Sequence, residues 1–447
     1  MKNIWILGFV GLCCISVTYC KIPTGSGERS ELPDSLSNGA IIILNEEKFP
    51  PIFTESSEYF EFDSKTIKKL VLEKEEAIKE FIKESNLGVE PKKYYVGLFS
   101  GFYLETITTQ QFQTLSSNSS LLTIQANLEI ESRRPMMQSD PIIQSRKPMM
   151  QDDWRYDSSN YASKYILQIG GGNPNVVMKE KRVWVVDSGI DPNHRDVVIS
   201  PTERNLGFSS INNEDPYFDG NGHGTMIAGI IGGKAFNQNL PGGDPANIGI
   251  NGVYPGAKMV SIKVLDSDGK GKRQTLYDGL DYIALSPATR IDDVVNMSLG
   301  RVKNGNSCTW GGKMDNLIIH RLATLKKVFV VMSAGNRAEE SINNYPGCLE
   351  GEFLFTVGSV ASVLGETAPN FTYSSFSNYG TPPIDWLATG EYVFTTYLND
   401  SYMLVSGTSM SAALVSGILY GKEAAPDILS TIQRGGTGPN YNVAKWK

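Results

Sequence analysis

The chain has 447 residues, a formal net charge of −7, 40% hydrophobic residues and 20% charged residues. This composition is that of a folded globular protein of two or three domains rather than a disordered chain. The acidic balance gives no support for nucleic-acid binding. Only three histidines are present, His194, His223 and His320, which leaves little material for a histidine-based zinc site.

The N-terminus has the pattern of a secretory signal peptide. Met1-Lys2-Asn3 precedes an apolar run, Ile4–Thr18, that is shorter than a usual membrane span. We therefore expect a signal peptide over residues 1–20 and secretion, with a lipid anchor on Cys20 as the alternative location. A disordered or core segment is the remaining interpretation. No later stretch is long and apolar enough to cross a bilayer, and the polar residues 21–39 are expected to be a linker.

A compact α+β pattern follows and predicts a domain over residues 40–132. Apolar runs and helical spacing predict four strands and two helices: Ala40–Leu44, Ser64–Ser85, Tyr94–Phe99, Phe102–Ile107, Thr108–Leu115 and Leu121–Ile130. The order β-α-β-β-α-β is the split βαβ arrangement of ferredoxin-like folds. Taken alone, this pattern also fits an unrelated α+β domain.

Residues 133–153 are predicted to be a polar linker in which the chain is cut. The basic pairs Arg133-Arg134 and Arg146-Lys147 lie within it. The cut could be made by this protein itself or by another protease that recognises basic pairs. A linker that is never cut is the third interpretation.

Residues 154–447 alternate between strands and helices. The expected strands are Arg182–Val186, Lys258–Leu265, Val294–Met297, Val328–Met332 and Leu354–Gly358, and the expected helices are His223–Ile231, Thr275–Leu285, Met314–Lys327 and Ser409–Gly421. Near-continuous apolar strands between helices indicate an α/β fold with a mostly parallel sheet covered on both faces. Ligands bind at the carboxyl ends of the strands in such sheets, and Asp187, Ser298 and Asn336 are predicted to lie there.

Three short stretches suggest nucleophilic catalysis. Val405–Gly417 places Ser409 at the start of an apolar helix, where free N–H groups and the helix dipole favour a negative oxygen; an N-cap serine is the ordinary alternative. Asn221–Gly229 places His223 between two glycines at the start of another helix. Asp187 ends a strand. Together they could supply a nucleophile, a base and a group that orients the base.

These stretches resemble the subtilisin-like serine proteases, in which the triad also runs Asp, His, Ser along the chain. Ser333-Ala-Gly-Asn336 is similar to the oxyanion-hole segment of that family, and the stretch from Gly252 to Asp266 to its central strand region. The resemblance implies catalysis by Asp187, His223 and Ser409. It also implies an oxyanion hole formed by Asn336 and the Ser409 amide.

The resemblance also implies roles outside the triad. The domain at 40–132 would be a propeptide that assists folding and inhibits the enzyme, as in the inhibitor I9 type. Ser298-Leu299-Gly300 would pair with an extended peptide substrate. Gly269–Arg273 would form the opposite edge strand, and its three positive charges could favour acidic residues upstream of the cut, although a solvated loop is the simpler interpretation.

Two further sites are expected from the same comparison and from the cysteines. Asp196 matches one calcium ligand of the family, and the loop Asp244–Gly252 matches the other half of that calcium site only roughly. A plain surface turn is the alternative interpretation. No cofactor is expected for catalysis. Cys308 and Cys348 remain after signal removal, so one disulfide is expected in an exported protein, with two buried thiols as the alternative.

The sequence therefore predicts a secreted serine endopeptidase that is made as a self-inhibited proenzyme and acts on proteins or peptides. A non-catalytic binding protein on the same fold is the rival from another class, but such a chain has usually lost a catalytic group. An esterase of another fold would carry Gly-x-Ser-x-Gly around its serine, which is absent around Ser409. The family usually has proline four residues after the serine, where this chain has Ala413. That position is inside the helix, so we do not expect the change to affect the reacting groups.

Overall fold

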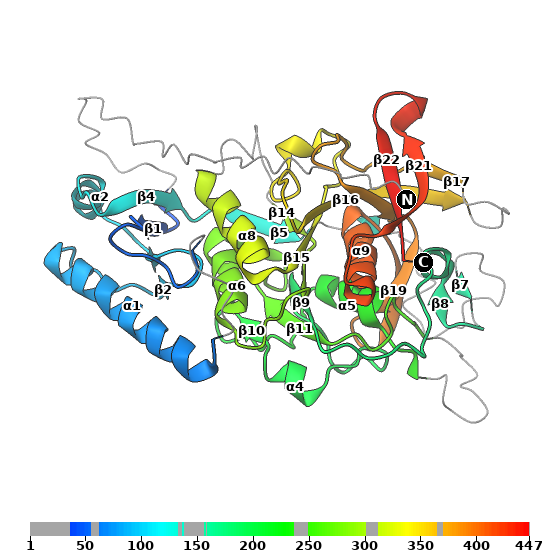
Figure 1. Cartoon of the computed structure of the whole chain (residues 1–447), viewed down its shortest axis with the longest axis horizontal. Helices are drawn as coiled ribbons and strands as arrows, with labels where there is room; N and C mark the ends of the chain where they lie inside the picture. Colours follow the sequence, from blue (N-terminus) through cyan, green and yellow to red (C-terminus); the bar gives the residue numbers. More distant parts are fainter. Residues whose placement is uncertain are drawn as a thin grey trace, which may run out of the picture.

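The structure is a computed structural model, and it describes residues 36–54, 62–132, 136–137, 156–157, 159–236, 249–300, 312–363 and 370–446. The predicted signal peptide and most of the two predicted linkers therefore lie outside the described residues. The described chain forms a smaller N-terminal unit and a larger unit around a central sheet, packed side by side (Figure 1). Among the described helices, none is both long enough and apolar enough to traverse a bilayer.

The N-terminal unit is a four-stranded antiparallel sheet with two helices. Its elements are β1 (Ala40–Leu44), α1 (Ser64–Glu84), β2 (Lys93–Tyr95), β3 (Gly101–Leu104), α2 (Thr109–Ser116) and β4 (Leu121–Ala126). The sheet order is β2-β3-β1-β4, which is the expected ferredoxin-like arrangement. Helix α1 begins where the Asp63 carboxylate accepts the backbone N–H groups of Lys65 and Thr66, satisfying donors that a helix leaves open.

Strand β2 is shorter than the predicted strand Tyr94–Phe99. After Tyr95 the backbone pairs elsewhere: the Val96 carbonyl accepts from Ile52, and the Leu98 N–H donates to the carboxylate of Asp281 at 2.8 Å. Asp281 belongs to the larger unit. A tertiary contact has therefore replaced the local ladder, which the hydrophobic pattern could not reveal.

The predicted strand Leu121–Ile130 is wrong, because two separate strands occupy it. Strand β4 ends at Ala126, and β5 (Glu129–Ser132) leaves the N-terminal sheet to join the larger unit. Asn127 marks the break: its side-chain carbonyl accepts the backbone N–H of Gln274 at 2.9 Å. The contact fixes the end of the N-terminal unit against the first turn of a helix in the larger unit.

The larger unit is built on a ten-stranded, mostly parallel sheet. Its order is β10-β11-β9-β13-β15-β16-β18-β22-β21, with β17 paired to β16. These strands are β9 (Val183–Asp187), β10 (Phe208–Ser209), β11 (Met259–Lys263), β13 (Val294–Met297), β15 (Phe329–Ser333), β16 (Leu354–Val363), β17 (Asn370–Tyr373), β18 (Trp386–Thr389), β21 (Asp427–Gln433) and β22 (Asn440–Lys445). The antiparallel pairs are β16 with β17 and β21 with β22.

Smaller elements complete the described chain. They are β6 (Met136–Met137), β7 (Tyr156–Asp157), β8 (Ala162–Ser163), α3 (Lys164–Gln168), α4 (Pro201–Arg204), β12 (Lys270–Lys272), β14 (Leu299–Gly300), β19 (Val393–Tyr397), β20 (Ser401–Ser406) and two 3-10 turns, η4 (Ser341–Asn343) and η5 (Arg434–Gly436). The β21–β22 hairpin was not anticipated and projects from the larger unit in Figure 1.

Helices cover both faces of the central sheet, as the apolar strands predict. Alternate residues of β9 show this: Val183 and Val185 pack with α5 (His223–Gly232) and α9 (Thr408–Lys422), whereas Trp184 and Val186 lie in the core shared with α6 (Arg273–Leu285) and α8 (Gly312–Lys326). That second core continues without a break into the N-terminal unit. Helices α6 and α8 therefore lie between the central sheet and the N-terminal sheet (Figure 1).

Candidate active site

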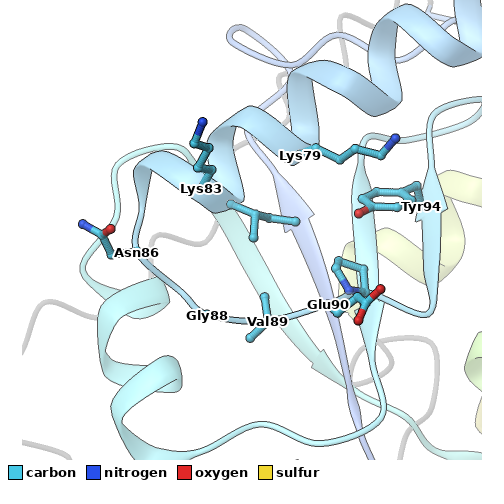
Figure 2. A pocket seen from close by; sticks show the side chains of 9 residues that line it. Lys79, Lys83, Asn86, Gly88, Val89, Glu90 and Tyr94 are labelled. Carbon is cyan, nitrogen blue, oxygen red and sulfur yellow. The ribbon is translucent and has the colours of Figure 1, made fainter.

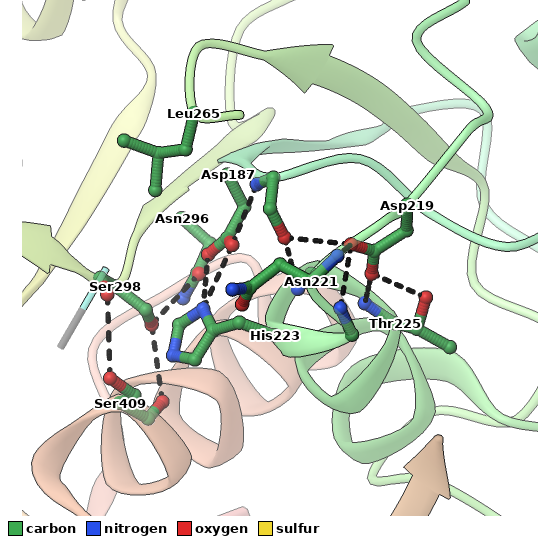
Figure 3. A network of polar contacts seen from close by, with 12 residues as sticks. Asp187, Asp219, Asn221, His223, Thr225, Leu265, Asn296, Ser298 and Ser409 are labelled. Atoms are coloured by element: carbon green, nitrogen blue, oxygen red, sulfur yellow. Dashed lines mark hydrogen bonds and ion pairs between the residues drawn. The ribbon is translucent and has the colours of Figure 1, made fainter. Parts of the chain in front are cut away.

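The carboxyl end of β9 and the start of α5 bring Asp187 and His223 together. The His223 Nδ1 atom lies 2.8 Å and 2.9 Å from the two carboxylate oxygens of Asp187. Both side chains are fully buried. Close approach is possible because Gly224 has no side chain; a Cβ there would lie 1.9 Å from the Gly189 carbonyl oxygen. In Figure 3 the imidazole ring points from Asp187 toward the first turn of α9.

A second carboxylate, Asp219, holds the start of α5 in place. One of its oxygens accepts the Ser188 hydroxyl at 2.9 Å and the Gly222 N–H at 2.8 Å; the other accepts the N–H and hydroxyl of Thr225 at 2.9 Å and 2.7 Å. These bonds satisfy orphan donors at the helix N-terminus and fix His223 (Figure 3). Asp219 was not among the predicted site residues, although an Asp three residues before Gly222 is a typical turn signal.

The buried His223 imidazole is tuned by its neighbours. Burial alone lowers the pKa of His223, but the charge and hydrogen bond of Asp187 outweigh it, so the pKa lies above its ordinary value of 6.5. Within the described structure, the His223 Nε2 atom is buried and has no hydrogen-bond partner. Asp187 thus holds Nδ1 while Nε2 stays available to accept a proton.

Ser409 lies in the first turn of α9, next to the end of β13. Its hydroxyl donates to the backbone carbonyl of Ser298 at 3.3 Å, and the Ser298 hydroxyl donates to the Ser409 carbonyl at 3.2 Å. Behind them, Asn296 accepts from the Ser298 hydroxyl at 3.1 Å and donates to Ser416 at 2.9 Å. Asn296 was not predicted, because an Asn inside an apolar strand carries no distinctive motif (Figure 3).

Asn336 presents an unpaired amide donor to the same site. Its Oδ1 atom accepts the Thr408 N–H at 2.9 Å and the Thr408 hydroxyl at 2.8 Å, which fixes the side-chain amide. Its Nδ2 atom is buried and, in the described structure, has no hydrogen-bond partner. A buried donor without a partner is costly, and at this site it is ready to receive an oxygen that carries negative charge.

The other two histidines have structural environments. His194 is buried, with Nε2 at 2.9 Å from the Ser401 carbonyl and Nδ1 accepting the Asp196 N–H at 3.1 Å. Burial lowers the pKa of His194 and of His320. Of the three histidines, His223 is the one whose ring lies beside the first turn of α9 in Figure 3.

Beside this centre, β5 lies as the middle strand between β12 and β14. Glu131 is opposite Lys270 on one side and Gly300 on the other, and Ser132 is opposite Leu299. Beyond the active-site serine, Met136 and Met137 pair with the end of β20. The described residues 129–132 and 136–137 are both in strands that pair with elements next to Ser409.

The Asp196 carboxylate, which is predicted to be a calcium ligand, accepts three hydrogen bonds from the protein. One of its oxygens accepts the Phe236 N–H at 2.8 Å; the other accepts the Ile250 N–H at 2.8 Å and the Tyr402 hydroxyl at 2.6 Å. These donors use three of the roughly four lone-pair sites of the carboxylate, and calcium binding at Asp196 stays a prediction. Most of the other predicted half, 244–252, lies outside the described residues.

Two remaining features lie apart from the catalytic centre. Cys348 forms a disulfide, while its predicted partner Cys308 lies outside the described residues, so that pairing stays a prediction. One pocket, with a cavity volume of 490 Å³, lies in the N-terminal unit between the end of α1 and the loop before β2 (Figure 2). Its lining combines the polar side chains of two lysines, Asn86, Glu90 and Tyr94 with apolar groups, and it contains neither serine nor histidine, so it is not the site of the proposed reaction.

Comparisons with known proteins agree with the geometry. The model of the subtilase family matches residues 179–430. The chain is 33% identical over 253 residues to the minor extracellular protease Epr of Bacillus subtilis, covering 55% of this chain and 33% of that protein. It is 35% identical over 237 residues to a thermostable alkaline protease of Halalkalibacterium halodurans, covering 53% of this chain and 55% of that protein.

Other similar proteins match more of their own length. Subtilisin BL of Lederbergia lenta is 33% identical over 236 residues, covering 53% of this chain and 73% of that protein. A cold-adapted subtilisin-like serine proteinase of known structure is 26% identical, with a TM-score of 0.39, covering 55% of this chain and 77% of that one. Because the family model spans more than half of the sequence and includes every residue assembled at the centre, this chain belongs to the subtilase family.

Proposed function

We propose that this protein is a serine endopeptidase that hydrolyses peptide bonds through an acyl-enzyme intermediate. The observation that carries the proposal is the pair of buried, unpartnered atoms at one centre, His223 Nε2 and Asn336 Nδ2, beside the Ser409 hydroxyl. His223 Nε2 is a base without a proton donor, and the Ser409 hydroxyl proton would satisfy it. Asn336 Nδ2 is a donor without an acceptor, and the oxygen of a peptide carbonyl would satisfy it.

The reaction follows from these groups. Ser409 Oγ attacks the peptide carbonyl carbon while His223 Nε2 takes the hydroxyl proton. The carbonyl oxygen becomes negative and is held by the Asn336 amide and the Ser409 N–H. The imidazolium then gives its proton to the leaving amine, which leaves an acyl-enzyme. Water, deprotonated by the same histidine, releases the acid and restores Ser409, while Asp187 stabilises the imidazolium in both steps.

We further propose that the protein is made as a secreted proenzyme in which the N-terminal unit is the inhibitor. Three observations support this: the ferredoxin-like order of its sheet, the continuous core it shares with α6 and α8, and the insertion of β5 between β12 and β14. A substrate bound there would compete for the same strand edges. The match to an extracellular protease and the sequence of residues 1–20 support secretion.

The strand registers also suggest where the chain is cut. Ser132 is opposite Leu299, and the residue before Leu299 is Ser298, whose carbonyl accepts the Ser409 hydroxyl. If the antiparallel register continues by one residue, residue 133 is opposite Ser298 and therefore next to Ser409. This register favours cutting of the bond after residue 133. The expected first residue of the mature chain is therefore Arg134.

The test is intact mass and N-terminal sequencing of the secreted wild-type chain and of Ser409→Ala, together with labelling by a fluorophosphonate that reacts with activated serines. Wild type that begins at residue 134 and is labelled, with an uncut and unlabelled mutant, would support both proposals. Cutting of both chains would assign maturation to another protease. A wild-type chain that is processed but neither labelled nor active on any peptide would favour the non-catalytic binding protein.

A further inference from the structure

We propose that β12 makes the substrate cleft selective for acidic residues at alternating positions upstream of the cut, with Lys270 and Lys272 as the specificity-determining residues. The preferred peptide has the pattern acidic, aliphatic, acidic, small, like the chain's own Glu129–Ser132. This inference rests on the proposed peptidase function and names its substrate class.

The register of β5 places charges of opposite sign across the strands. Lys270 lies opposite Glu131, and Lys272 lies opposite Glu129. The pairing is anchored at the cut end by the Ser132 N–H, which donates to the Gly269 carbonyl at 2.7 Å. Directly opposite residues of an antiparallel pair point to the same face of the sheet, so each lysine shares a face with one glutamate.

The two faces of β5 differ in the way the proposed pattern requires. Ile130 and Ser132 are buried, with 4% and 3% of their surface exposed, whereas Glu129 is exposed and Glu131 is half-buried. Alternate side chains of a strand face opposite sides. The inward positions therefore take an aliphatic and a small side chain, and the outward positions meet lysine.

Of the two described strands that flank β5, only β12 carries charge. Strand β14, on the other side of β5, is Leu299–Gly300 and carries no charge. Arg273, the third positive residue of the predicted loop, is turned away: its guanidinium binds the Asp315 carboxylate at 2.8 Å and the Ala126 carbonyl at 2.7 Å. Two of the three charges singled out in the sequence therefore remain on the cleft.

The nearby negative groups do not cancel these lysines. Two acidic residues, Asp266 and Asp268, lie in the turn before β12: the Asp266 carboxylate accepts the backbone N–H groups of Asp268 and Lys270, both at 2.9 Å, and the Asp268 side chain is exposed to water. Among the described residues, neither lysine forms an ion pair with a carboxylate. Their attraction for an acidic substrate therefore acts without direct contact and is screened by salt.

The expected effect is modest and measurable. Each opposed pair of charges across two strands changes binding by about 1.4- to 5-fold, so two pairs give about 2- to 30-fold. The assay compares two internally quenched peptides that differ only at the outward positions. One has the sequence of residues 129–137, and the other has glutamine in place of both glutamates. The measured quantity is the ratio of their kcat/KM values with the processed wild-type enzyme.

We expect a ratio between about 2 and 30 at low salt that falls toward 1 at high salt. The ratio should also fall toward 1 in the double variant Lys270→Gln, Lys272→Gln. The matched control is Lys258→Gln, a half-buried lysine paired with Glu180 away from the cleft, which should keep the wild-type ratio.

A wild-type ratio of 1 or below, with both peptides cleaved, would overturn the selectivity but leave the peptidase intact. A high ratio that survives the double substitution would overturn the assignment to these lysines. Failure to cleave either peptide, together with no labelling by the fluorophosphonate, would overturn the proposed function itself.

Discussion

Removing the carboxylate of Glu46 should weaken the hold of the N-terminal unit on the protease unit. Glu46 follows β1, and its two oxygens bind the two terminal nitrogens of Arg321 on α8 at 2.6 Å and 2.8 Å. The side chains are 18% and 5% exposed. The pair therefore joins the two units in a place that water reaches only at its edge, and Glu46→Ala would remove the carboxylate that binds both terminal nitrogens of the buried guanidinium.

The size of the effect follows from burial. Removing one partner of a buried ion pair costs about 3–5 kcal/mol. We expect the lower end, about 3 kcal/mol, because Arg321 keeps its bond to the Leu98 carbonyl at 2.9 Å. In the separated units Arg321 would be exposed to water on α8. The lost free energy therefore weakens the association of the two units and not the stability of the separated units. At 1.4 kcal/mol per tenfold change, dissociation becomes about 100-fold easier.

Dilution of the processed complex measures this change. Activity on a chromogenic peptide appears as the N-terminal unit dissociates, and the protein concentration at half-maximal activity should be about 100-fold higher for Glu46→Ala than for wild type. The matched control is Glu105→Ala, which removes the exposed pair with Lys92 at 3.5 Å, where the side chains are 57% and 62% exposed. Equal shifts for both variants, or none for Glu46→Ala, would refute the reasoning.

Four further outcomes are expected. Asp187→Asn should slow self-cleavage by about 10⁴, followed by mass spectrometry, because His223 loses its tautomer and the stabilisation of its charged form. Since the pKa of His223 is raised above 6.5 by Asp187 and the neutral form is the base, kcat/KM should rise with pH through a midpoint above 6.5; a midpoint below 6.5 would contradict this. Asn336→Ala should lower kcat by about 10²–10³ with little change in KM, a magnitude measured for an oxyanion donor of a subtilisin rather than derived from this structure. Asp196→Asn should lower the free energy of unfolding by about 2 kcal/mol, because a charged acceptor of three hydrogen bonds becomes neutral; a loss seen only in the presence of calcium would instead make Asp196 a metal ligand.

The sequence predicted the parts of the fold whose interactions are local or repeat along the chain. The apolar run of β9 ends at Asp187 as expected, and α5 begins at His223, because a strand buried on both faces and a helix that begins after Gly222 leave plain patterns. The order of elements in the N-terminal unit is confirmed for the same reason.

The parts that sequence reasoning missed depend on contacts between distant segments. Strand β5 was read as a continuation of β4, because its partners are more than a hundred residues away in β12 and β14. Asp219 and Asn296 act through the groups they position, and an isolated Asp or Asn carries no signal for that. The N–H and O–H donors that bind the Asp196 carboxylate come from distant segments that only the tertiary structure brings near, and its role as a calcium ligand stays a prediction.

Removal of β5 would leave β12 and β14 as open strand edges with unpaired backbone groups. Such edges invite pairing between molecules and aggregation. Here both are short, and β12 carries a lysine on each side of Gly271. Positive charge on an edge strand discourages a second, like-charged copy from adding to it. The lysines that would attract an acidic peptide would therefore also keep the matured protein molecules apart from one another.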